Sequence, residues 1–237
     1  MKKIIFATGN QDKMREIREI LSDMDVEVLS MKEAGITAEI VEDGKTFEEN
    51  AAIKAKAICQ LTQEIVLADD SGLEIDALNK EPGIYSARYM GEDTSYRIKN
   101  ANLIERLAGV PDEKRTARFV CAVAAAFPDG NVKVVRETME GRIAYAEAGR
   151  NGFGYDPIFF LPEYGCTSAE LSREEKNDRL TIDDRLHVFQ QIVSADPGIY
   201  FTDPADEDNL MITLFDTILD FPQECAAQIN CCLNGFQ

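Results

Sequence analysis

Two apolar runs flank a short turn in the middle of the chain: Arg118-Phe-Val-Cys-Ala-Val-Ala-Ala-Ala-Phe127 and Val132-Lys-Val-Val-Arg-Glu-Thr-Met139. The turn between them contains Pro128-Asp-Gly130, and Pro, Asp and Gly are residues that favour a reversal of the chain. Each run is long enough for a strand and contains β-branched or aromatic residues, which are enriched in strands. The stretch therefore predicts an antiparallel hairpin.

The segments around this hairpin alternate between strand and helix patterns. Short apolar runs predict strands, and apolar residues three and four positions apart predict helices. The expected elements are strand 3–7, helix 12–22, strand 25–29, helix 46–62, strand 64–68, a hairpin-like stretch at 73–90, helix 94–108, and strands 116–127, 131–145 and 157–160. Helices between strands favour parallel pairing, whereas a hairpin is antiparallel. We therefore expect an α/β fold with a mixed, elongated central sheet flanked by helices, and two lobes with a cleft between them.

Composition limits the classes of partner. At 237 residues with 45% hydrophobic content, the chain can bury a substantial core. A formal net charge of −18 argues against binding of a nucleic-acid polymer, which needs a basic surface. No apolar run approaches the roughly 20 residues that cross a bilayer, and the first apolar run is too short for a secretion signal. The six cysteines lack the paired spacing of metal ligands, and most are interpreted as small apolar core residues in a reducing cytoplasm. We therefore expect a cytoplasmic protein with no membrane partner.

The first polar motif, Thr8-Gly9-Asn10-Gln11-Asp12-Lys13, follows the strand expected at 3–7. It puts free backbone N–H groups and a lysine at the N-terminus of the next helix, an arrangement that attracts anions such as phosphate. The motif lacks the second Gly and the Lys-Ser/Thr pair of a Walker loop. The alternative is an ordinary turn between a strand and a helix.

The second motif, Asp69-Asp70-Ser71-Gly72, follows the strand expected at 64–68. We expect this strand to end on the two carboxylates, and Ser71 and Gly72 to begin a turn. Neighbouring residues at a strand end point in different directions, so one carboxylate can reach into a cleft while the other orients a turn or a lysine. The alternative is that both aspartates only cap a turn.

Further polar residues upstream extend this second motif into a possible metal site. A carboxylate opposite bound phosphates is repelled unless a cation lies between them, and Mg²⁺ is the hard cation that prefers oxygen ligands. Glu42 and Glu49 are the additional acidic candidates. Lys54 follows them on a helix that is expected to begin near Thr46.

The third motif is Gly152-Phe153-Gly154-Tyr155-Asp156-Pro157. Glycines on both sides of Phe153 let the backbone fold tightly and approach a flat ligand. Tyr155 and Asp156 offer stacking and an acceptor for a base N–H. The alternative is a simple turn that leads into the following apolar run.

Taken in order, these motifs resemble the Ham1-like family of inosine/xanthosine triphosphate pyrophosphatases. The resemblance covers residues 1–177 at spacing typical of that family. The matching segments are Phe6-Ala-Thr-Gly-Asn10 with Lys13, Thr46-Phe-Glu-Glu-Asn-Ala51 with Lys54, Leu67-Ala-Asp-Asp-Ser-Gly-Leu73, Pro82-Gly-Ile-Tyr-Ser-Ala-Arg88, Gly152-Phe-Gly-Tyr-Asp-Pro-Ile-Phe-Phe160, Ala169-Glu-Leu-Ser172 and Glu175-Lys-Asn177.

The resemblance implies an Mg²⁺-dependent enzyme that hydrolyses inosine and xanthosine (deoxy)nucleoside triphosphates at the α–β linkage. The products would be the nucleoside monophosphate and pyrophosphate, so the enzyme would remove deaminated purines from the nucleotide pool. It also implies a homodimer, with the nucleotide in the cleft between the two lobes.

The resemblance further implies roles for individual residues. Asp70 is expected to be the catalytic acceptor and a Mg²⁺ ligand, and Glu42 a second Mg²⁺ ligand. The residues expected to bind the substrate are Thr8, Gly9, Asn10, Lys13, Lys54, Ser71, Phe153, Gly154, Tyr155, Asp156 and Lys176. The first four of these would hold the triphosphate, and residues 153–156 would form the wall of the base site. Because an unperturbed Asp is a poor base at neutral pH, Asp70 is expected to act together with metal-bound water.

The family pattern stops after Asn177. Members continue with Ser-His-Arg, which helps to read the purine base, whereas Leu180-Thr181-Ile182 stands at the corresponding place here. His187, the single histidine of the chain, is either a displaced substitute or a structural residue in an amphipathic stretch. The alternative function is therefore a nucleotide-binding protein with lost or relaxed base selectivity. The presence of Asp70 and Glu42 favours the enzyme, since a binder has little need for metal-coordinating acids.

Residues 178–237 also differ in composition from the rest of the chain. They contain eleven acidic residues against two basic ones, and so carry −9 of the total charge of −18. Two hypotheses explain the change: a frameshift or gene rearrangement after Asn177, or a genuine variant that reads the base differently. The apolar run Leu210-Met-Ile-Thr-Leu-Phe215 is atypical of a solvated linker. We therefore expect a core domain at 1–177 and a divergent acidic segment at 178–237 that packs on the core or on a partner subunit.

Overall fold

The computed structural model describes residues 2–8, 11–21, 26–38 and 40–172. All of them belong to the first of the two compact units into which the chain divides, residues 1–199. The predictions for Gly9, Asn10, Lys176, His187 and the acidic segment 178–237 therefore lie outside the described residues.

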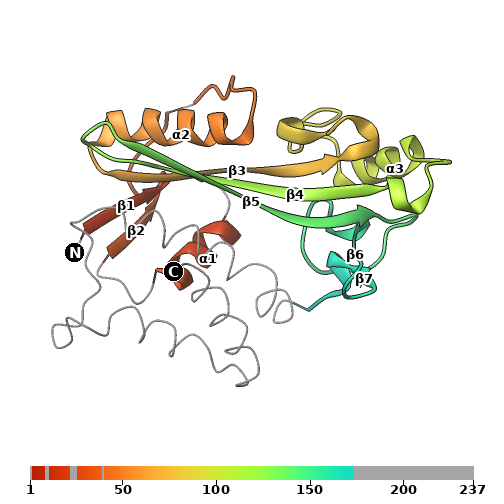
Figure 1. The fold of residues 1–237 in the computed structure, drawn as a ribbon. Coiled ribbons are helices and arrows are strands. Elements are labelled where there is room, and N and C mark those ends of the chain that lie inside the picture. Colours follow the sequence, from red (N-terminus) through yellow and green to blue (C-terminus); the bar gives the residue numbers. More distant parts are fainter. Residues whose placement is uncertain (1, 9–10, 22–25, 39, 173–237) are drawn as a thin grey trace, which may run out of the picture. The chain divides into compact units, whose positions relative to one another are not determined.

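One seven-stranded sheet organises the described part of the chain, in the order β2-β1-β3-β4-β5-β6-β7 (Figure 1). β1 pairs in parallel with β2 and β3, and every later pairing is antiparallel. The strands are β1 (Lys2–Phe6), β2 (Val26–Ser30), β3 (Ile65–Ile75), β4 (Thr116–Ala126), β5 (Val132–Ile143), β6 (Phe159–Leu161) and β7 (Cys166–Thr167). The predicted mixed α/β sheet is confirmed, whereas two lobes with a cleft between them stay a prediction.

The β4–β5 hairpin forms as its sequence predicts. The two strands pair continuously from Thr116 opposite Arg142 to Ala126 opposite Val132. Within the turn, the Gly130 N–H donates to the Phe127 carbonyl at 2.9 Å, and Gly130 adopts a φ of +91° that other residues rarely tolerate. β3 pairs along the other edge of β4, so the hairpin and β3 together supply the three long strands of the sheet.

The helices of the described residues are α1 (Gln11–Ile20), α2 (Phe47–Thr62) and α3 (Tyr96–Arg106), with short 3-10 helices η1 (Asp76–Leu78), η2 (Gly83–Tyr85), η3 (Asp112–Lys114), η4 (Asp156–Ile158) and η5 (Ser168–Glu170). α2 begins where its sequence predicts, because the Thr46 hydroxyl accepts a hydrogen bond from the Glu49 N–H at 3.1 Å and so caps the first turn. The carboxylate of Glu49 accepts from the Lys45 N–H at 2.6 Å, so this candidate acid serves the start of the helix. No helix in the described ranges is long and apolar enough to span a membrane.

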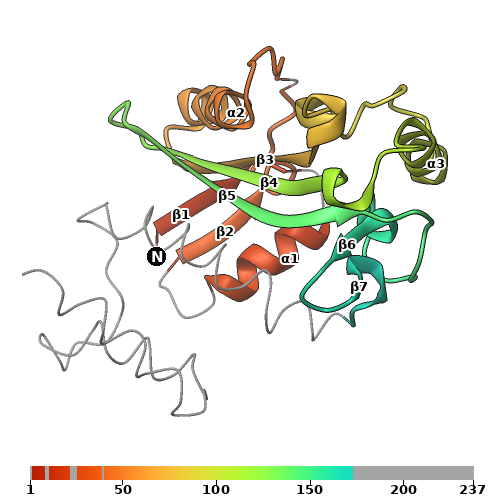
Figure 2. The same cartoon turned by 45° about the vertical axis from the view of Figure 1, so that its right-hand side comes forward.

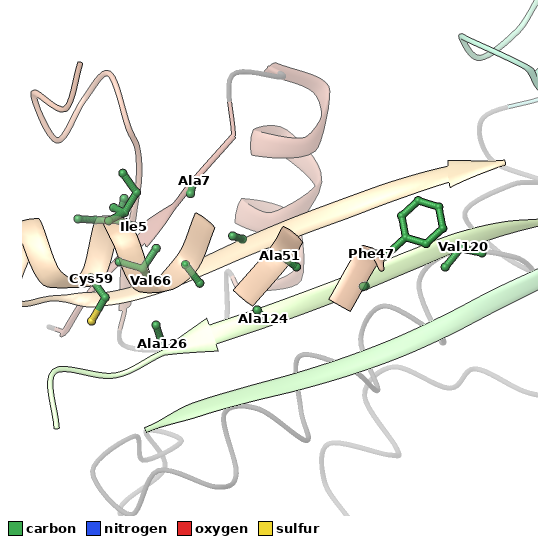
Figure 3. Packing of buried hydrophobic residues seen from close by; sticks show 13 residues of the cluster. Ile5, Ala7, Phe47, Ala51, Cys59, Val66, Val120, Ala124 and Ala126 are labelled. Carbon is green, nitrogen blue, oxygen red and sulfur yellow. The ribbon is translucent and has the colours of Figure 1, made fainter. Parts of the chain in front are cut away.

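α1 and α2 pack on opposite faces of the sheet (Figures 1 and 2). Ala51, Ala55 and Ile58 of α2 pack against one face, together with Ala68 of β3 and Ala124 of β4 (Figure 3). The small alanines allow the helix backbone to approach the strands closely. Met14 and Ile17 of α1, with Leu21 just after it, pack against the other face of the sheet. On that face the strands present Ile4, Phe6, Leu67 and Val123. This alternation along each strand decides which side chains meet which helix.

A third core cluster lies where β3 and β4 extend beyond α2. Leu103 and Leu107, from α3 and its end, pack there with Leu73 and Ile75 of β3 and with Phe159 of β6. Both leucines are fully buried. The long strands therefore join two regions of packing, and the Asp-Asp-Ser-Gly motif lies on β3 between them.

The prediction that β3 ends at residue 68 and turns at Ser71 and Gly72 is wrong. β3 continues to Ile75, because residues 66–75 pair with residues 126–117 of β4 without a break. A Cβ added at Gly72 would lie 2.5 Å from the Ser86 hydroxyl and 2.7 Å from the Gly83 carbonyl. Gly72 therefore serves the close approach of η2 to the strand, and not a turn.

The hairpin-like stretch predicted at 73–90 is also largely absent. Among the described residues, the two halves of this stretch pair with each other only through an isolated β-bridge between Glu74 and Pro82. The segment is held instead by the Ser86 hydroxyl, which accepts from the Leu73 N–H at 2.8 Å and donates to the Gly83 carbonyl at 2.6 Å. Side-chain hydrogen bonds have replaced the strand pairing that the local pattern predicted.

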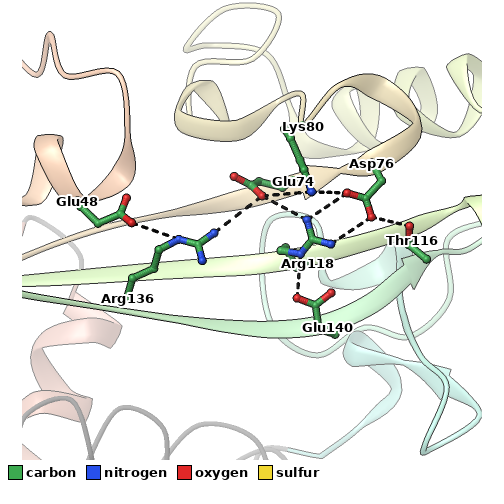
Figure 4. Close-up of polar contacts among 8 residues, drawn as sticks. All are labelled: Glu48, Glu74, Asp76, Lys80, Thr116, Arg118, Arg136 and Glu140. Carbon is green, nitrogen blue, oxygen red and sulfur yellow. Dashed lines mark hydrogen bonds and ion pairs between the residues drawn. The ribbon is translucent and has the colours of Figure 1, made fainter.

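A network of charged side chains joins β3, η1, β4 and β5 (Figure 4). Arg118 donates to both carboxylate oxygens of Asp76 at 3.1 Å and to Glu140 at 2.8 Å. Lys80 and Thr116 also contact Asp76, and these contacts, led by the one with Lys80, hold the pKa of Asp76 well below its usual range. The network links side chains on three neighbouring strands, and Arg136 of β5 extends it from Glu74 to Glu48 of α2.

Candidate functional site

The two adjacent aspartates of β3 face opposite sides of the sheet. Asp69 forms an ion pair with Lys13 of α1. The Asp70 carboxylate accepts a hydrogen bond at 3.0 Å from the side-chain amide of Asn50 on α2. Consecutive strand residues point to opposite faces, and α1 and α2 cover those two faces. The prediction that one carboxylate orients a lysine is confirmed for Asp69.

Asn50 connects Asp70 to the segment before α2. Its side chain is buried, with 1% of its surface exposed, and its oxygen accepts from the Gly44 N–H at 2.9 Å. A Cβ at Gly44 would lie 2.6 Å from that oxygen, so the glycine lets the backbone reach the amide. Asn50 was missed as a site residue, although it lies within the Thr46–Ala51 segment that carries the family resemblance.

Lys54 lies one turn along α2 from Asn50 and contacts two parts of the site. Its ammonium forms an ion pair with Glu42 at 3.2 Å and donates to the backbone carbonyl of Asp69 at 3.0 Å. Both side chains are mostly buried, with exposed fractions of 17% for Lys54 and 27% for Glu42. The structure therefore brings the predicted residues Glu42, Lys54 and Asp70 together on the α2 face of the sheet.

Burial raises the pKa of Asp70 above its ordinary value, and it is the largest of the influences on this carboxyl. The hydrogen bond from Asn50 and the charge of Lys54 oppose that rise, whereas the negative charges of Glu42 and Asp69 add to it. A carboxylate that is desolvated and repelled by its neighbours is more stable with a cation close by.

The residues present fit a magnesium ion bound in the way that phosphate-handling sites bind it. No group of three or more His, Cys, Asp or Glu side chains within the described ranges is arranged to hold a metal. Mg²⁺ is commonly held by one or two carboxylates, with waters and substrate phosphates as its other ligands. Glu42 and Asp70 are two such carboxylates, and a bound cation would offset both the burial that chiefly raises the pKa of Asp70 and the smaller repulsion from Glu42.

A second group of predicted residues lies on the other side of β3. The Ser71 hydroxyl donates to Asp69 at 3.3 Å, and Asp69 is paired with Lys13. Thr8 is the second residue after β1, and the N–H of Ala7 between them donates to the Leu67 carbonyl at 2.8 Å. The end of β1 therefore lies beside β3 just before the Asp69-Asp70 motif.

The Gly152–Asp156 loop presents one aromatic ring and buries the other. Phe153 is 66% exposed, whereas Tyr155 is 4% exposed and donates its hydroxyl to the Ser86 carbonyl at 2.7 Å. Burial raises the pKa of Tyr155. Both glycines of the loop adopt positive φ values, +77° at Gly152 and +65° at Gly154, which allow the tight turn.

Asp156 holds this loop from within. One carboxylate oxygen accepts from the Phe153 N–H at 2.8 Å, and the other accepts from the Ser168 hydroxyl at 2.7 Å. From a different element, the side-chain amide of Asn100 on α3 donates to the Gly154 carbonyl at 3.3 Å. Asn100 is a second residue that sequence reasoning missed, because no local pattern relates α3 to a loop that lies 54 positions away.

Comparison with known proteins places these motifs in a family. The model of the Ham1 family matches residues 4–195, which extends past Asn177. A curated dITP/XTP pyrophosphatase of Exiguobacterium sibiricum is 48% identical over 174 residues, covering 73% of this chain and 88% of that protein. One from Geobacillus kaustophilus is 49% identical over 177 residues, covering 75% of this chain and 87% of that protein.

Solved structures show the same fold. The Staphylococcus aureus Ham1 protein superposes with a TM-score of 0.76 at 39% identity, covering 82% of this chain and 99% of that one. A HAM1 protein from Coxiella burnetii superposes with a TM-score of 0.76 at 35% identity, covering 83% of this chain and 100% of that one.

Proposed function

Since the chain belongs to the Ham1 family, we propose that it is a nucleoside triphosphate pyrophosphatase that acts on dITP and XTP. The reaction is hydrolysis at the α–β linkage, which releases the nucleoside monophosphate and pyrophosphate. The observation that carries this proposal is the grouping of Asp70, Glu42 and Lys54 on one face of β3. Two carboxylates and a lysine in one partly buried place suit a phosphoanhydride better than a neutral substrate.

In this proposal Asp70 and Glu42 are the ligands of a magnesium ion. When bound, Mg²⁺ neutralises charge on the phosphates and lowers the pKa of a coordinated water. The raised pKa of Asp70 makes its carboxylate a better proton acceptor than an ordinary aspartate, and the Asn50 amide fixes the direction in which it points. Asp70 thus orients the attacking water and accepts its proton.

The lysines hold the triphosphate in this proposal. Lys54 reaches between Glu42 and the Asp69 carbonyl, and Lys13 lies on the other side of β3, where Asp69 holds it. Two ammonium groups on either side of β3, just past the point where β1 stops pairing with it, can contact different phosphates of one triphosphate. Thr8, Gly9, Asn10 and Ser71 are proposed to add hydrogen bonds to the phosphates, and Lys176 to contact the substrate.

For the base, we assign stacking to Phe153 because its ring is the exposed one. Tyr155 and Asp156 were expected in the wall of the base site. We propose that they act by holding the loop, since the Tyr155 hydroxyl and both Asp156 oxygens already bond protein groups. Gly154 supplies the positive φ that the loop needs.

The loss of Ser-His-Arg favours a second candidate, a nucleotide-binding protein with lost or relaxed base selectivity. Leu180-Thr181-Ile182 cannot donate to a purine carbonyl through arginine or histidine side chains. We further propose a homodimer that works in the cytoplasm, on the strength of the family resemblance and the acidic, cysteine-bearing composition.

The test is pyrophosphate release from dITP, XTP, dGTP and ATP with Mg²⁺, measured on the full chain. We expect fast release from dITP and XTP and slow release from the other two. The variant Asp70→Asn should abolish release while it retains nucleotide binding. Glu74→Gln, on the same strand and the same face as Asp70, is the matched control and should keep the wild-type rate.

The outcomes separate the two candidates. Similar release from all four nucleotides would support relaxed selectivity, and binding without release would support the nucleotide-binding protein. In either case the triple variant Leu180→Ser, Thr181→His and Ile182→Arg tests whether the missing motif is the cause. Wild-type turnover in Asp70→Asn would refute the role given to Asp70.

A further inference from the structure

Tyr96, the first residue of α3, packs directly against the base loop. Its ring lies perpendicular to that of Tyr155, with the two ring centres 5.2 Å apart. A Cβ placed on Gly154 would lie 3.5 to 3.9 Å from three carbons of the Tyr96 ring. The ring is therefore in contact distance of both the backbone and an aromatic side chain of the loop.

Two neighbours on the same face of α3 hold the Tyr96 ring and the loop together. The ammonium of Lys99 lies 4.9 Å from the centre of the ring and donates to the Ala87 carbonyl at 2.6 Å, and Lys99 is fully buried. Asn100 bonds the Gly154 carbonyl at 3.3 Å and the Glu147 carboxylate at 3.0 Å. Residues three and four positions apart share one face of a helix, so this turn supports the ring as a unit.

Despite this support, Tyr96 keeps a free polar end. Its surface is 36% exposed, against 4% for Tyr155. No hydrogen bond to the Tyr96 hydroxyl exists among the residues that the structure describes. A phenol held by its ring, with a hydroxyl available, is a group that can bond a ligand.

The positive charge of Lys13, in the proposed triphosphate site, also acts on the phenol of Tyr96. Burial raises its pKa, and the positive charge of Lys13 opposes that rise. The Tyr96 ring thus contacts the loop at Gly154, and its phenol is subject to the charge of Lys13, which is proposed to hold the phosphates.

We propose that Tyr96 is a substrate-binding residue whose hydroxyl hydrogen-bonds a sugar hydroxyl of the nucleotide. In a nucleotide the sugar is joined directly to the base, and Tyr96 packs against the loop that carries Phe153 while its hydroxyl has no hydrogen-bond partner among the described residues. The hydroxyl present in both ribo- and deoxyribonucleotides is the 3′-hydroxyl, and this is the group assigned to Tyr96. The inference rests on the proposed function and adds a sugar contact to it.

The test compares Tyr96→Phe with the wild-type chain on ITP, dITP and 2′,3′-dideoxy-ITP. Removing one hydrogen bond should lower kcat/KM by roughly 3- to 10-fold on ITP and dITP, through KM and with kcat unchanged. On the dideoxy nucleotide, which lacks the bonding partner, the two proteins should be equal. Tyr145→Phe, which removes the hydroxyl of a 63% exposed tyrosine outside the site, is the control and should match the wild type throughout.

An equal loss on all three nucleotides, or no loss on any, would overturn the assignment. A structural role of the hydroxyl would produce the equal loss, because it does not depend on the sugar. If the wild-type chain released no pyrophosphate, the proposed activity would fail. The same three nucleotides, with binding measured by calorimetry on the wild type and Tyr96→Phe, would then decide the sugar contact separately.

Discussion

Replacing Asn50 by alanine tests the central geometry of the site, because this one side chain joins three segments. It donates to Asp70 on β3 at 3.0 Å, accepts from the Gly44 N–H at 2.9 Å, and belongs to α2. It is 1% exposed, so water does not replace these bonds freely in the folded protein. The substitution Asn50→Ala removes both bonds and leaves a buried carboxylate without its amide donor.

The expected loss of unfolding free energy follows from the two hydrogen bonds that Asn50→Ala removes. A hydrogen bond to a neutral group contributes about 1 kcal/mol to stability, and one to a charged group contributes about 1.5 to 3 kcal/mol. We therefore expect Asn50→Ala to lower the free energy of unfolding by roughly 2 to 4 kcal/mol at neutral pH. Because Asp70 also loses the group that directs its carboxylate, kcat for pyrophosphate release should fall as well.

The assay is urea denaturation of the full chain, followed by circular dichroism, with pyrophosphate release measured on the same preparations. Gln60→Ala changes an exposed position of the same helix and should alter the free energy of unfolding by less than about 0.5 kcal/mol. If Asn50→Ala unfolded at the same urea concentration as Gln60→Ala and kept its kcat, the amide would not hold Asp70, and the geometry derived for the site would be wrong.

Two further predictions concern stability away from the catalytic group. Gly72→Ala should lower the free energy of unfolding by about 1 to 3 kcal/mol, because its Cβ would meet the Ser86 hydroxyl at 2.5 Å and the Phe47 ring at 2.9 Å. Unfolding of this variant at the same urea concentration as the wild type would contradict the reasoning. Asp76 has a folded pKa below its unfolded value of about 3.9, so its contacts with Lys80, Thr116 and Arg118 stabilise the fold above that pH, and the stabilisation is lost as pH falls through the folded pKa. Asp76→Asn should therefore be less stable than the wild type at neutral pH, and the difference in stability should shrink as the pH is lowered. Thermal melts at several pH values measure this difference. A difference that grew towards low pH would refute the prediction.

The sequence correctly predicted those helices and strands whose formation depends on residues close together in the chain. The hairpin forms because its turn residues and apolar runs are contiguous, and α2 starts where Thr46 can cap it. The error at β3 has a tertiary cause. Asp, Ser and Gly favour turns, but residues 69–75 remain extended because β4 offers a continuous partner and η2 packs over Gly72.

The site shows the same division. The motifs predicted that Asp70, Glu42, Lys54 and Lys13 belong to one chemistry, because phosphates and a metal need those residue types. The motifs predicted that the two aspartates point in different directions, but the Asp-Asp pattern alone did not predict which of them would meet Lys13, nor that Phe153 and not Tyr155 would be the exposed ring. Those facts depend on which helix covers which face of β3, and on the Ser86 carbonyl that takes the Tyr155 hydroxyl.

By itself, then, the sequence determined the family and the mixed α/β class, and it predicted the order of α1 to α3 and β1 to β6 and the residue types of the candidate site, because each of these depends on short contiguous patterns. Only the tertiary structure decided the partners of the functional side chains. Asn50 meets Asp70 across 20 positions and Lys13 meets Asp69 across 56. Contacts at such separations exist because the sheet and its two helices pack together, and no local pattern carries the information that packing adds.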